Sequence, residues 1–304
     1  PDSFFSRLES MTLPEMAISV LQDFMKDDFT DTELQDICGS AFNFPIPLKE
    51  IEEQLYVLEL FHGPSLAFKD VGARFLSEVL KKIALEKGGR ITVLVATSGD
   101  TGSAVAKSFY NVEGVEVVLL YPSGKVSPLQ EKTLTTMNGN IRAVEIDGTF
   151  DDCQKLVKKA FSDQDIRARI SLTSANSINI GRFLPQMVYY FWAWNQIPPE
   201  QRKNVLFSVP SGNYGNISAG ILACKMGLPI SQFIAAANVN RVFPDYLDTG
   251  QYEPRAAVAT LSNAMDVGDP SNFIRVMELF GHAYKEVVNM ISGHVASDEE
   301  TLEA

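Results

Sequence analysis

The sequence predicts an α/β protein with two parallel-sheet units and a helical region at its N-terminus. Two observations lead to this class: short β-branched runs alternate with helical patterns, and these runs fall into two groups separated by the helix-rich residues 150–200. Strands that alternate with helices are typical of parallel sheets covered by helices. A chain of 304 residues is also long enough for about two domains.

Residues 1–41 show helical patterns. Apolar residues recur at helical spacing in PEMAISVLQDFM (14–25), and the acidic stretch DDFTDTELQD (27–36) begins a second predicted helix. The proline-containing FNFPIPLKE (42–50) is typical of a linker.

The alternation of strands and helices begins after this linker. Strands are expected at 91–97, 115–121, 141–146, 204–209 and 233–239. Helices are expected among them at 101–111, 127–137, 151–163, 179–197 and 214–226.

Composition excludes several classes of protein. The net charge of −12 argues against nucleic-acid binding, because nothing would offset phosphate repulsion. No apolar run reaches membrane-spanning length, and the N-terminus lacks the pattern of a secretory signal. The three cysteines, Cys38, Cys153 and Cys224, are widely spaced, which indicates reduced thiols and a cytoplasmic protein. With three histidines and no close Cys/His cluster, we expect no metal site.

Two glycine-rich turns each follow a predicted strand and open a predicted helix. ATSGDTGSAVA (96–106) follows ITVLV, and VPSGNYGNISAG (209–220) follows NVLFSV. N–H groups at such a turn bind carboxylate or phosphate, although Asp100 or Thr101 could simply cap its helix. The spacing in the second turn matches neither the dinucleotide fingerprint nor the P-loop. Two such turns in one chain favour anion binding over ordinary βα connections.

Three further segments carry candidate polar residues. SANSINIGRFLPQ (174–186) contains Arg182, whose planar fork suits phosphate oxygens. KVSPLQEK (125–132) offers Lys125 and Ser127 to an anion, although Ser127-Pro128 also fits a helix start. LSNAMD (261–266) indicates only a turn that leads into a helix.

Lys69 lies in HGPSLAFKDVG (62–72), near the first turn of an amphipathic helix. Most lysines are exposed to solvent, and an exposed Lys69 would be structural. A buried lysine behaves differently, because desolvation lowers its pKa and supplies the neutral amine that condenses with an aldehyde.

HGPSLAFKD, ATSGDTG, SANSINIGR, VPSGNYGN and LSNAMD occur in this order, and in these motifs the chain resembles the threonine synthases of the longer bacterial and fungal type. The resemblance runs from about residue 10 to the end. It implies the fold of pyridoxal-phosphate enzymes similar to the tryptophan synthase β-subunit (fold type II), with pyridoxal 5′-phosphate between two α/β domains. The division that it implies is a helical region and linker at 1–52, a large cofactor-binding domain at 53–88 and 174–304, and a small domain at 89–173.

The resemblance assigns roles residue by residue. Lys69 matches the lysine that forms the Schiff base with pyridoxal phosphate and shuttles protons. Asp100 matches a position where related enzymes often have Asn, which there bonds the cofactor's 3′-oxygen. The cradle for the cofactor phosphate matches Ser211, Gly212, Asn213, Tyr214, Gly215 and Asn216. The substrate carboxylate would meet Ser98, Gly99 and Thr101, and the substrate phosphate Asn176, Ser177 and Arg182. Lys125, Ser127 and Asn213 are further candidates near the substrate phosphate.

The reaction that the resemblance implies converts O-phospho-L-homoserine and water to L-threonine and phosphate. It implies a small-molecule substrate and neither nucleic acid nor membrane as a partner, and it leaves open a monomer or a homodimer. Family members continue past the position of Ala304, and that tail supplies a hydroxyl near the cofactor's pyridine nitrogen. We therefore expect this chain by itself to be an incomplete enzyme with weak or absent activity.

Three alternatives remain at the level of the sequence. A serine/threonine dehydratase or a cysteine synthase would keep the lysine and the glycine turns but needs no second phosphate site, so residues 174–182 discriminate against them. A nucleotide-binding oxidoreductase is disfavoured by the absent G-x-G-x-x-G. A non-catalytic small-molecule binding protein would show no visible cofactor absorbance.

Overall fold

The computed structural model describes residues 2–303, which separate into two compact units. The four-stranded unit contains Met11–Ile51 and Leu55–Pro185. The three-stranded unit contains the residues up to Ser10, Glu52–Gln54, and the chain from Gln186 onward. Each unit is named after its main sheet and is described by itself.

The four-stranded unit is built on a parallel sheet with the strand order β5-β4-β3-β6. Its strands are β3 (Ile91–Ala96), β4 (Val115–Pro122), β5 (Ile141–Ile146) and β6 (Ser171–Ser174). In the register of the sheet, Val93 lies between Val117 and Thr173. This arrangement confirms the predicted parallel sheet.

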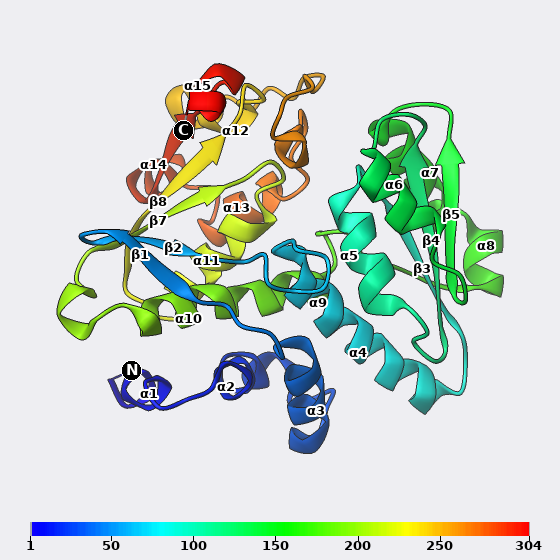
Figure 1. The fold of residues 1–304 in the computed structure, drawn as a ribbon, viewed down its shortest axis with the longest axis horizontal. Coiled ribbons are helices and arrows are strands. Elements are labelled where there is room, and N and C mark those ends of the chain that lie inside the picture. Colours follow the sequence, from blue (N-terminus) through cyan, green and yellow to red (C-terminus); the bar gives the residue numbers. More distant parts are fainter. Residues whose placement is uncertain (1, 304) are drawn as a thin grey trace. The chain divides into compact units, whose positions relative to one another are not determined.

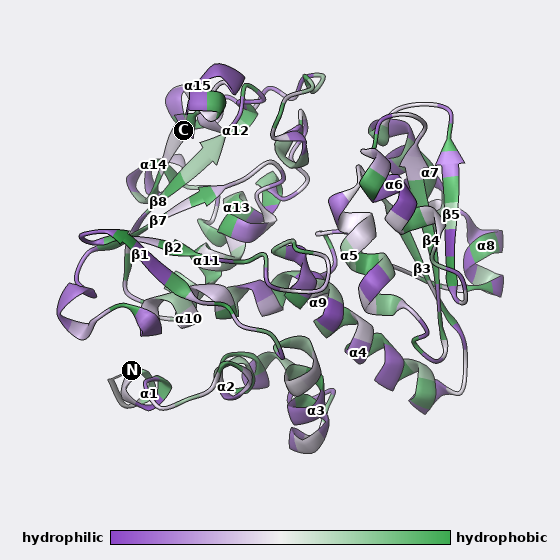
Figure 2. Ribbon diagram, in the orientation of Figure 1, coloured by the Kyte–Doolittle hydropathy of each residue, from purple (hydrophilic) through white to green (hydrophobic). Residues whose placement is uncertain are grey.

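Helices cover both faces of this sheet, as the alternation of side chains along a strand requires. Val93 and Val95 belong to a buried cluster with residues of α4, α5 and α6, whereas Leu94 packs with Cys153 and Val157 of α7. The helices are α4 (Lys69–Lys87), α5 (Asp100–Phe109), α6 (Pro128–Thr135), α7 (Phe150–Ser162) and α8 (Gln164–Arg169). Figure 2 shows hydrophobic residues alternating with hydrophilic ones along the helices of this unit.

The remaining elements of this unit precede α4 or follow β6. α2 (Leu13–Met25) and α3 (Asp31–Ala41) each begin with a capping box, and α3 packs against α4. β1 (Leu48–Glu52) and β2 (Leu55–Leu58) form a separate two-stranded sheet. α9 (Ile180–Phe183) also packs against α4, as Figure 1 shows.

The three-stranded unit has a parallel sheet with the order β7-β8-β9. Its strands are β7 (Val205–Pro210), β8 (Ile230–Ala237) and β9 (Ile291–Val295). Its α-helices are α1 (Asp2–Leu8), α10 (Met187–Gln196), α11 (Gly215–Lys225), α12 (Val242–Thr249), α13 (Phe273–Leu279), α14 (Tyr284–Met290) and α15 (Asp298–Glu303). α10 and α11 pack together over β8, where a Cβ on Gly220 would lie 2.6 Å from the Tyr190 ring and 2.7 Å from that of Phe233.

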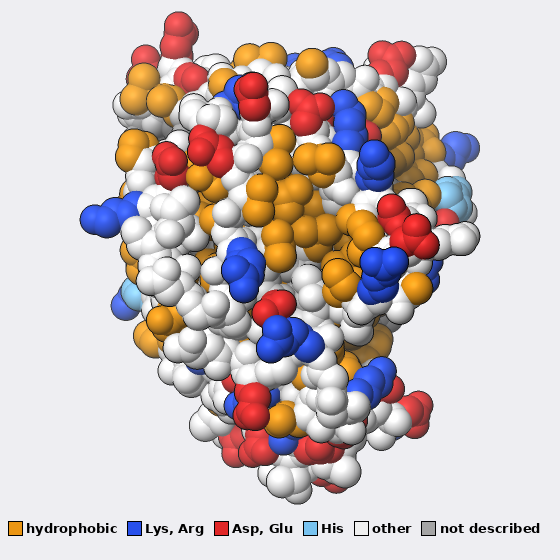
Figure 3. Space-filling model, turned by 90° about the vertical axis from the view of Figure 1, so that its right-hand side faces the viewer, with side chains coloured by type: hydrophobic (Ala, Val, Ile, Leu, Met, Phe, Trp, Pro, Cys, Tyr) orange, Lys and Arg blue, Asp and Glu red, His pale blue; other side chains and the backbone are white. Residues whose placement is uncertain are grey.

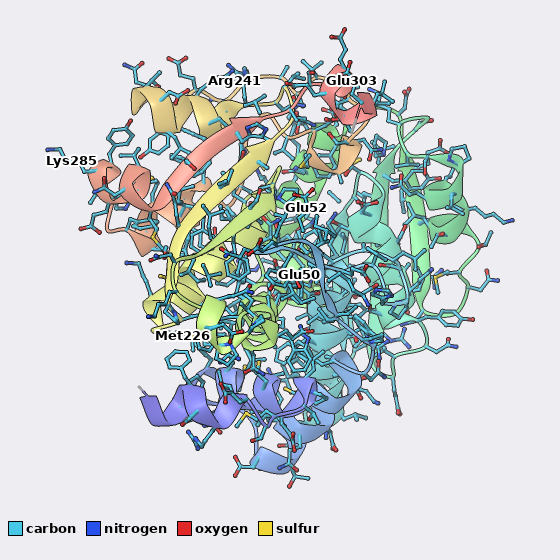
Figure 4. All side chains as sticks on the ribbon, turned by 60° about the vertical axis from the view of Figure 1, so that its left-hand side comes forward. Glu50, Glu52, Met226, Arg241, Lys285 and Glu303 are labelled. Carbon is cyan, nitrogen blue, oxygen red and sulfur yellow. The ribbon has the colours of Figure 1, made fainter. Side chains whose placement is uncertain are left out.

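The surface carries charges of both signs. On the face in Figure 3, acidic and basic side chains are interspersed around a central hydrophobic patch. In the three-stranded unit, Arg241 pairs with Asp245 at 2.6 Å, and Figure 4 shows Arg241 and Lys285 at the periphery. Across residues 2–303, no helix is long and apolar enough to cross a membrane. No cluster of His, Cys, Asp and Glu in that range has the arrangement of a metal site.

The predicted elements are confirmed with some shifts in their boundaries. The strand expected at 233–239 is β8, at Ile230–Ala237. The helix expected at 179–197 is broken into α9, a 3-10 turn at Leu184–Gln186, and α10, because Pro185 has no N–H to continue an α-helix. The short strands β1, β2, β6 and β9 were not expected. The domain division 1–52, 53–88 with 174–304, and 89–173 stays a prediction.

Gly220→Ala tests the packing of the three-stranded unit. The new methyl group would overlap the rings of Tyr190 and Phe233, so we expect a loss of about 1–3 kcal/mol in the free energy of unfolding. Gly39→Ala is the matched control, because a Cβ there meets nothing within 4 Å; it should add about 0.5–1 kcal/mol, as alanine favours the interior of α3. Urea unfolding of both variants measures the difference, and equal stabilities would contradict the close packing.

Candidate functional site

Lys69 is the first residue of α4, and the loop before it folds over the start of that helix. Asp70 is fully buried, and its Oδ2 accepts a hydrogen bond of 2.9 Å from the Ser65 N–H. A Cβ on Gly63 would collide with this carboxylate, so the loop needs glycine there. The positive end of the helix favours the negative charge of Asp70. These contacts fix the backbone from which the Lys69 side chain extends.

The amine of Lys69 is sheltered from solvent. Its side chain is 16% exposed, and its Nζ lies 3.3 Å from Oδ2 of Asp100. Burial lowers the pKa of Lys69 below the ordinary value of a lysine, and the positive charge of Arg182 lowers it further. Asp100 raises the pKa without overcoming the effect of burial. Lys69 therefore offers more neutral amine at a given pH than an exposed lysine does.

The turn that contains Asp100 connects β3 to α5. Thr97, which is fully buried, accepts hydrogen bonds at its Oγ1 from the N–H groups of Gly99 (2.9 Å) and Gly102 (2.7 Å). Gly99 has φ of 132°, a conformation that side chains disfavour. The next two N–H groups, of Asp100 and Thr101, belong to the first turn of α5, where no helix carbonyl can accept from them. An anion at this turn would meet those two donors.

Asp100 also contacts a residue that the sequence did not indicate. Its Oδ1 accepts a hydrogen bond of 2.8 Å from Nε2 of Gln130. Gln130 is part of the capping box that begins α6, and its Oε1 accepts from the Ser127 N–H at 3.0 Å. Ser127 thus caps α6. The S-x-x-Q pattern predicts a capping box, but nothing in it predicts the second contact to Asp100.

Arg182 lies where α9 packs on α4. It is 3% exposed, and its Nη1 donates a hydrogen bond of 2.6 Å to the carbonyl of Ala175. The two helices approach so closely that a Cβ on Gly72 would lie 2.8 Å from the Arg182 carbonyl oxygen. The guanidinium is therefore a fixed positive charge near Lys69.

Asn176 and Asn179 shape the chain that leads to Arg182. Nδ2 of Asn176 donates to the Ala96 carbonyl at 2.8 Å, which ties the end of β6 to the end of β3. Asn179 caps α9 by accepting from the Gly181 N–H at 2.8 Å. Ser177 lies between them. The predicted residues Lys69, Ser98, Gly99, Asp100, Thr101, Asn176, Ser177 and Arg182 thus all belong to the four-stranded unit.

The SGNYGN loop, Ser211–Asn216, connects β7 to α11 in the three-stranded unit. Its side chains hold the loop together: Oγ of Ser211 donates to Oδ1 of Asn216 at 2.7 Å, and Nδ2 of Asn216 donates to the Pro210 carbonyl at 2.7 Å. Tyr214 has φ of 58°, a left-handed conformation that costs about 1–3 kcal/mol for a residue other than glycine. The loop then enters α11 at Gly215, so the first-turn N–H groups of the helix lie within it.

LSNAMD is a second support of this loop. Backbone atoms of Met265 lie so close to Gly212 that a Cβ there would be 2.6 Å from the Met265 Cα. Asp266 accepts hydrogen bonds from Asn238 (2.8 Å) and from the Thr260 N–H (2.9 Å). Asn213 is held from the other side, because its Oδ1 accepts from the Ser271 N–H at 2.6 Å. The segment expected to be a simple turn therefore fixes the backbone against which Gly212 packs.

The site residues that sequence reasoning missed are those that orient others. Thr97 and Gln130 act on the SGDTG turn, and Asp266 acts on the segment beside Gly212. Thr97 belongs to the motif ATSGDTG, which is a usable signal, whereas the contact of Gln130 comes from a different helix. The backbone N–H of Lys125 donates a hydrogen bond to the Pro122 carbonyl at 3.3 Å. The contact of the Lys125 side chain with an anion stays a prediction.

Comparison with known proteins adds independent findings. The family described as "Pyridoxal-phosphate dependent enzyme" matches residues 40–304. The threonine synthase of Haemophilus influenzae is 50% identical over 296 residues, which cover 97% of this chain and 69% of that protein. The threonine synthase of Escherichia coli is 50% identical over 284 residues, covering 93% of this chain and 65% of the relative. This chain thus spans about two thirds of the length of these relatives.

Solved structures agree with the sequence comparisons. The crystal structure of threonine synthase from Escherichia coli matches with a TM-score of 0.92 and 46% identity, covering 99% of this chain and 70% of that one. A threonine synthase from Brucella melitensis, described as bound to PLP, matches with a TM-score of 0.90 and 34% identity, covering 98% and 70%. A pyridoxal 5′-phosphate-dependent aspartate racemase, 14% identical with a TM-score of 0.61, shares the fold.

The chemical reactivity of Lys69 tests its lowered pKa. Acetic anhydride acetylates the neutral amine, so the pH at half-maximal labelling reports the pKa. We expect the Lys69 midpoint to lie below the value of about 10.4 that is usual for lysine. Asp100→Asn should lower the Lys69 midpoint further, because it removes the negative charge that stabilises the ammonium form. Mass mapping of the peptides measures the midpoint in each protein, and a Lys69 midpoint at or above that usual value would contradict the shelter.

Proposed function

Because this chain belongs to the threonine synthases among the pyridoxal-phosphate-dependent enzymes, we propose that it carries the catalytic lysine of an enzyme converting O-phospho-L-homoserine and water to L-threonine and phosphate. The observation that carries the proposal is the sheltered amine of Lys69, with its lowered pKa, next to a glycine turn that presents helix N–H groups. An ordinary surface lysine would be neither desolvated nor paired with the carboxylate of such a turn.

The residues fit pyridoxal 5′-phosphate chemically. The cofactor needs an amine for its aldehyde, which Lys69 supplies, and donors for its phosphate. The SGNYGN loop supplies those donors, because its internal hydrogen bonds fix it at the start of α11, a helix of 11 residues. When bound, pyridoxal phosphate supplies a carbonyl that condenses with an amine and a ring that withdraws electrons from the substrate carbon.

Lys69 performs the proton transfers in this proposal. A base that must take a proton near neutral pH works best when its pKa is lowered toward that range, and burial acts on Lys69 in that direction. Oδ2 of Asp100 accepts a hydrogen bond from Nζ of Lys69 at 3.3 Å. This bond limits the directions in which the amine can point. Lys69 is thereby available to take and return protons at neighbouring carbons of one substrate.

The substrate carries two anionic groups, and the four-stranded unit offers two kinds of positive site. The N–H groups of Asp100 and Thr101 at the start of α5, with the hydroxyls of Ser98 and Thr101, suit the substrate carboxylate. The guanidinium of Arg182, held by the Ala175 carbonyl, suits a phosphate, with Asn176 and Ser177 beside it in the chain. Charge that grows on the departing phosphate would be stabilised by a group already in place. The free thiols of Cys38, Cys153 and Cys224 support a cytoplasmic location for this chemistry.

Covalent trapping tests the role of Lys69. Borohydride reduction after incubation with pyridoxal phosphate should fix the cofactor to the peptide that contains Lys69, and Lys69→Ala should lose the label. Lys81→Ala, at a lysine of the same helix whose side chain is 42% exposed, should keep it. Peptide mass mapping decides the outcome, and labelling at any other lysine would remove Lys69 from its assigned role.

Arg182→Lys tests the phosphate site. The variant keeps the positive charge but loses the planar fork, so phosphate release from O-phosphohomoserine by the full-length protein should fall about 10²–10³-fold in kcat. Trapping of the cofactor at Lys69 should persist, which separates the loss from misfolding. Turnover equal to that of the unaltered protein would exclude Arg182 from the site.

A further inference from the structure

Asp100 lies between two donors that come from different helices. Its Oδ2 accepts from Nζ of Lys69 at 3.3 Å, and its Oδ1 accepts from Nε2 of Gln130 at 2.8 Å. An ionised carboxylate can only accept hydrogen bonds, and each oxygen of Asp100 accepts from one of these donors. The contact to Gln130 is the shorter one, and Gln130 has no part in the residues assigned to cofactor or substrate.

The amide of Gln130 can face Asp100 in only one orientation. Its Oε1 accepts from the Ser127 N–H at 3.0 Å, and the Gln130 N–H in turn donates to the Ser127 Oγ at 3.3 Å. Since the carboxylate of Asp100 only accepts hydrogen bonds, the NH₂ group of Gln130 is the part that points at Asp100. The start of α6 therefore sets the direction of this donor.

The glycine turn is shaped to admit Gln130. A Cβ on Gly99 would overlap Cδ and Oε1 of Gln130 and would lie 2.6 Å from its Nε2. The side chain of Gln130 thus lies directly across the turn whose helix begins with Asp100. Position 99 therefore favours glycine for two reasons: a side chain would collide with Gln130, and the backbone has a positive φ.

We propose that Gln130 is a positioning residue of the lysine centre, which holds the carboxylate of Asp100 so that Oδ2 faces the amine of Lys69. The inference rests on the proposed function only for the use to which that amine is put. When Lys69 has given up one ammonium proton, its hydrogen bond to Asp100 is no longer strengthened by the positive charge. Gln130 then remains to stabilise the carboxylate and to keep it in place for the returning amine.

The competing explanation is that Gln130 serves α6 alone, as the last member of its capping box. The two explanations differ in what happens when Asp100 is changed. A positioning residue acts on Lys69 through Asp100, so its effect disappears once Asp100 is replaced. An effect of the cap on the stability of α6 does not depend on Asp100.

A double-mutant cycle in the chain without added cofactor tests this inference. The readout is the pH midpoint of Lys69 acetylation, measured for the unaltered chain, Gln130→Met, Asp100→Asn and the double variant. We expect Gln130→Met to lower the midpoint by about 0.5–1 pH unit, because the released carboxylate turns away and the ammonium loses its partner. In the Asp100→Asn background the same substitution should leave the midpoint unchanged.

Two further variants secure the interpretation. Glu33→Met removes the corresponding side chain from the capping box that begins α3. It should lower the melting temperature without moving the Lys69 midpoint. If Gln130→Met does not fold, Gln130→Asn retains an amide that is one methylene too short to bond Ser127 and Asp100 together, and it should lower the midpoint likewise.

An unchanged midpoint in a folded Gln130 variant would overturn the proposal, and so would a shift of equal size in the Asp100→Asn background. Neither result bears on cofactor attachment, because the labelling is done without cofactor. The borohydride experiment would instead reveal a failure of the threonine synthase proposal. Its result does not affect the interpretation of the acetylation midpoints.

Discussion

Removing the ammonium group of Lys69 from water is the constraint on which the candidate site depends. The cost of desolvation lowers the pKa of the amine, and Arg182 adds to this effect, while a single carboxylate at 3.3 Å prevents the ammonium from being wholly uncompensated. This balance between burial and the carboxylate matters for chemistry. Without the carboxylate, the amine would have no partner to orient it. If the carboxylate outweighed the cost of burial, the ammonium would hold its proton too tightly to act as a base.

The parallel sheets supply the positions for this balance. In the four-stranded unit, the turns after β3 and β6 lead to Asp100 and Arg182, and Asn176 ties the ends of these two strands together. A turn from strand to helix brings polar residues and helix N–H groups to the carboxyl ends of parallel strands. The three-stranded unit repeats the same device once, in the loop from β7 to α11. The topology thus provides the N–H groups that can bind anions, and the side chains in each turn orient those groups.

Much of this arrangement could be predicted from the sequence, since local patterns carry it. Strand and helix alternation predicted both parallel sheets, and the motifs around Lys69 and Asp100 predicted residues that the structure brings into contact. Contacts between remote segments could not be predicted: the capping pattern of Gln130 indicates α6 but not its bond to Asp100, 30 residues away. The four-residue strand β6, SLTS, is too short and too polar to stand out. The roles in cofactor and substrate binding stay predictions.

The pKa of Lys69 tests the central claim most directly. A pH titration of the Lys69 side-chain nitrogen by NMR, in the chain without cofactor, would follow this one group without chemical modification. The account predicts a midpoint clearly below the value of about 10.4 that is usual for lysine. A midpoint at or above that value would mean that the amine is an ordinary solvated ammonium group, and the catalytic interpretation of this residue would be wrong.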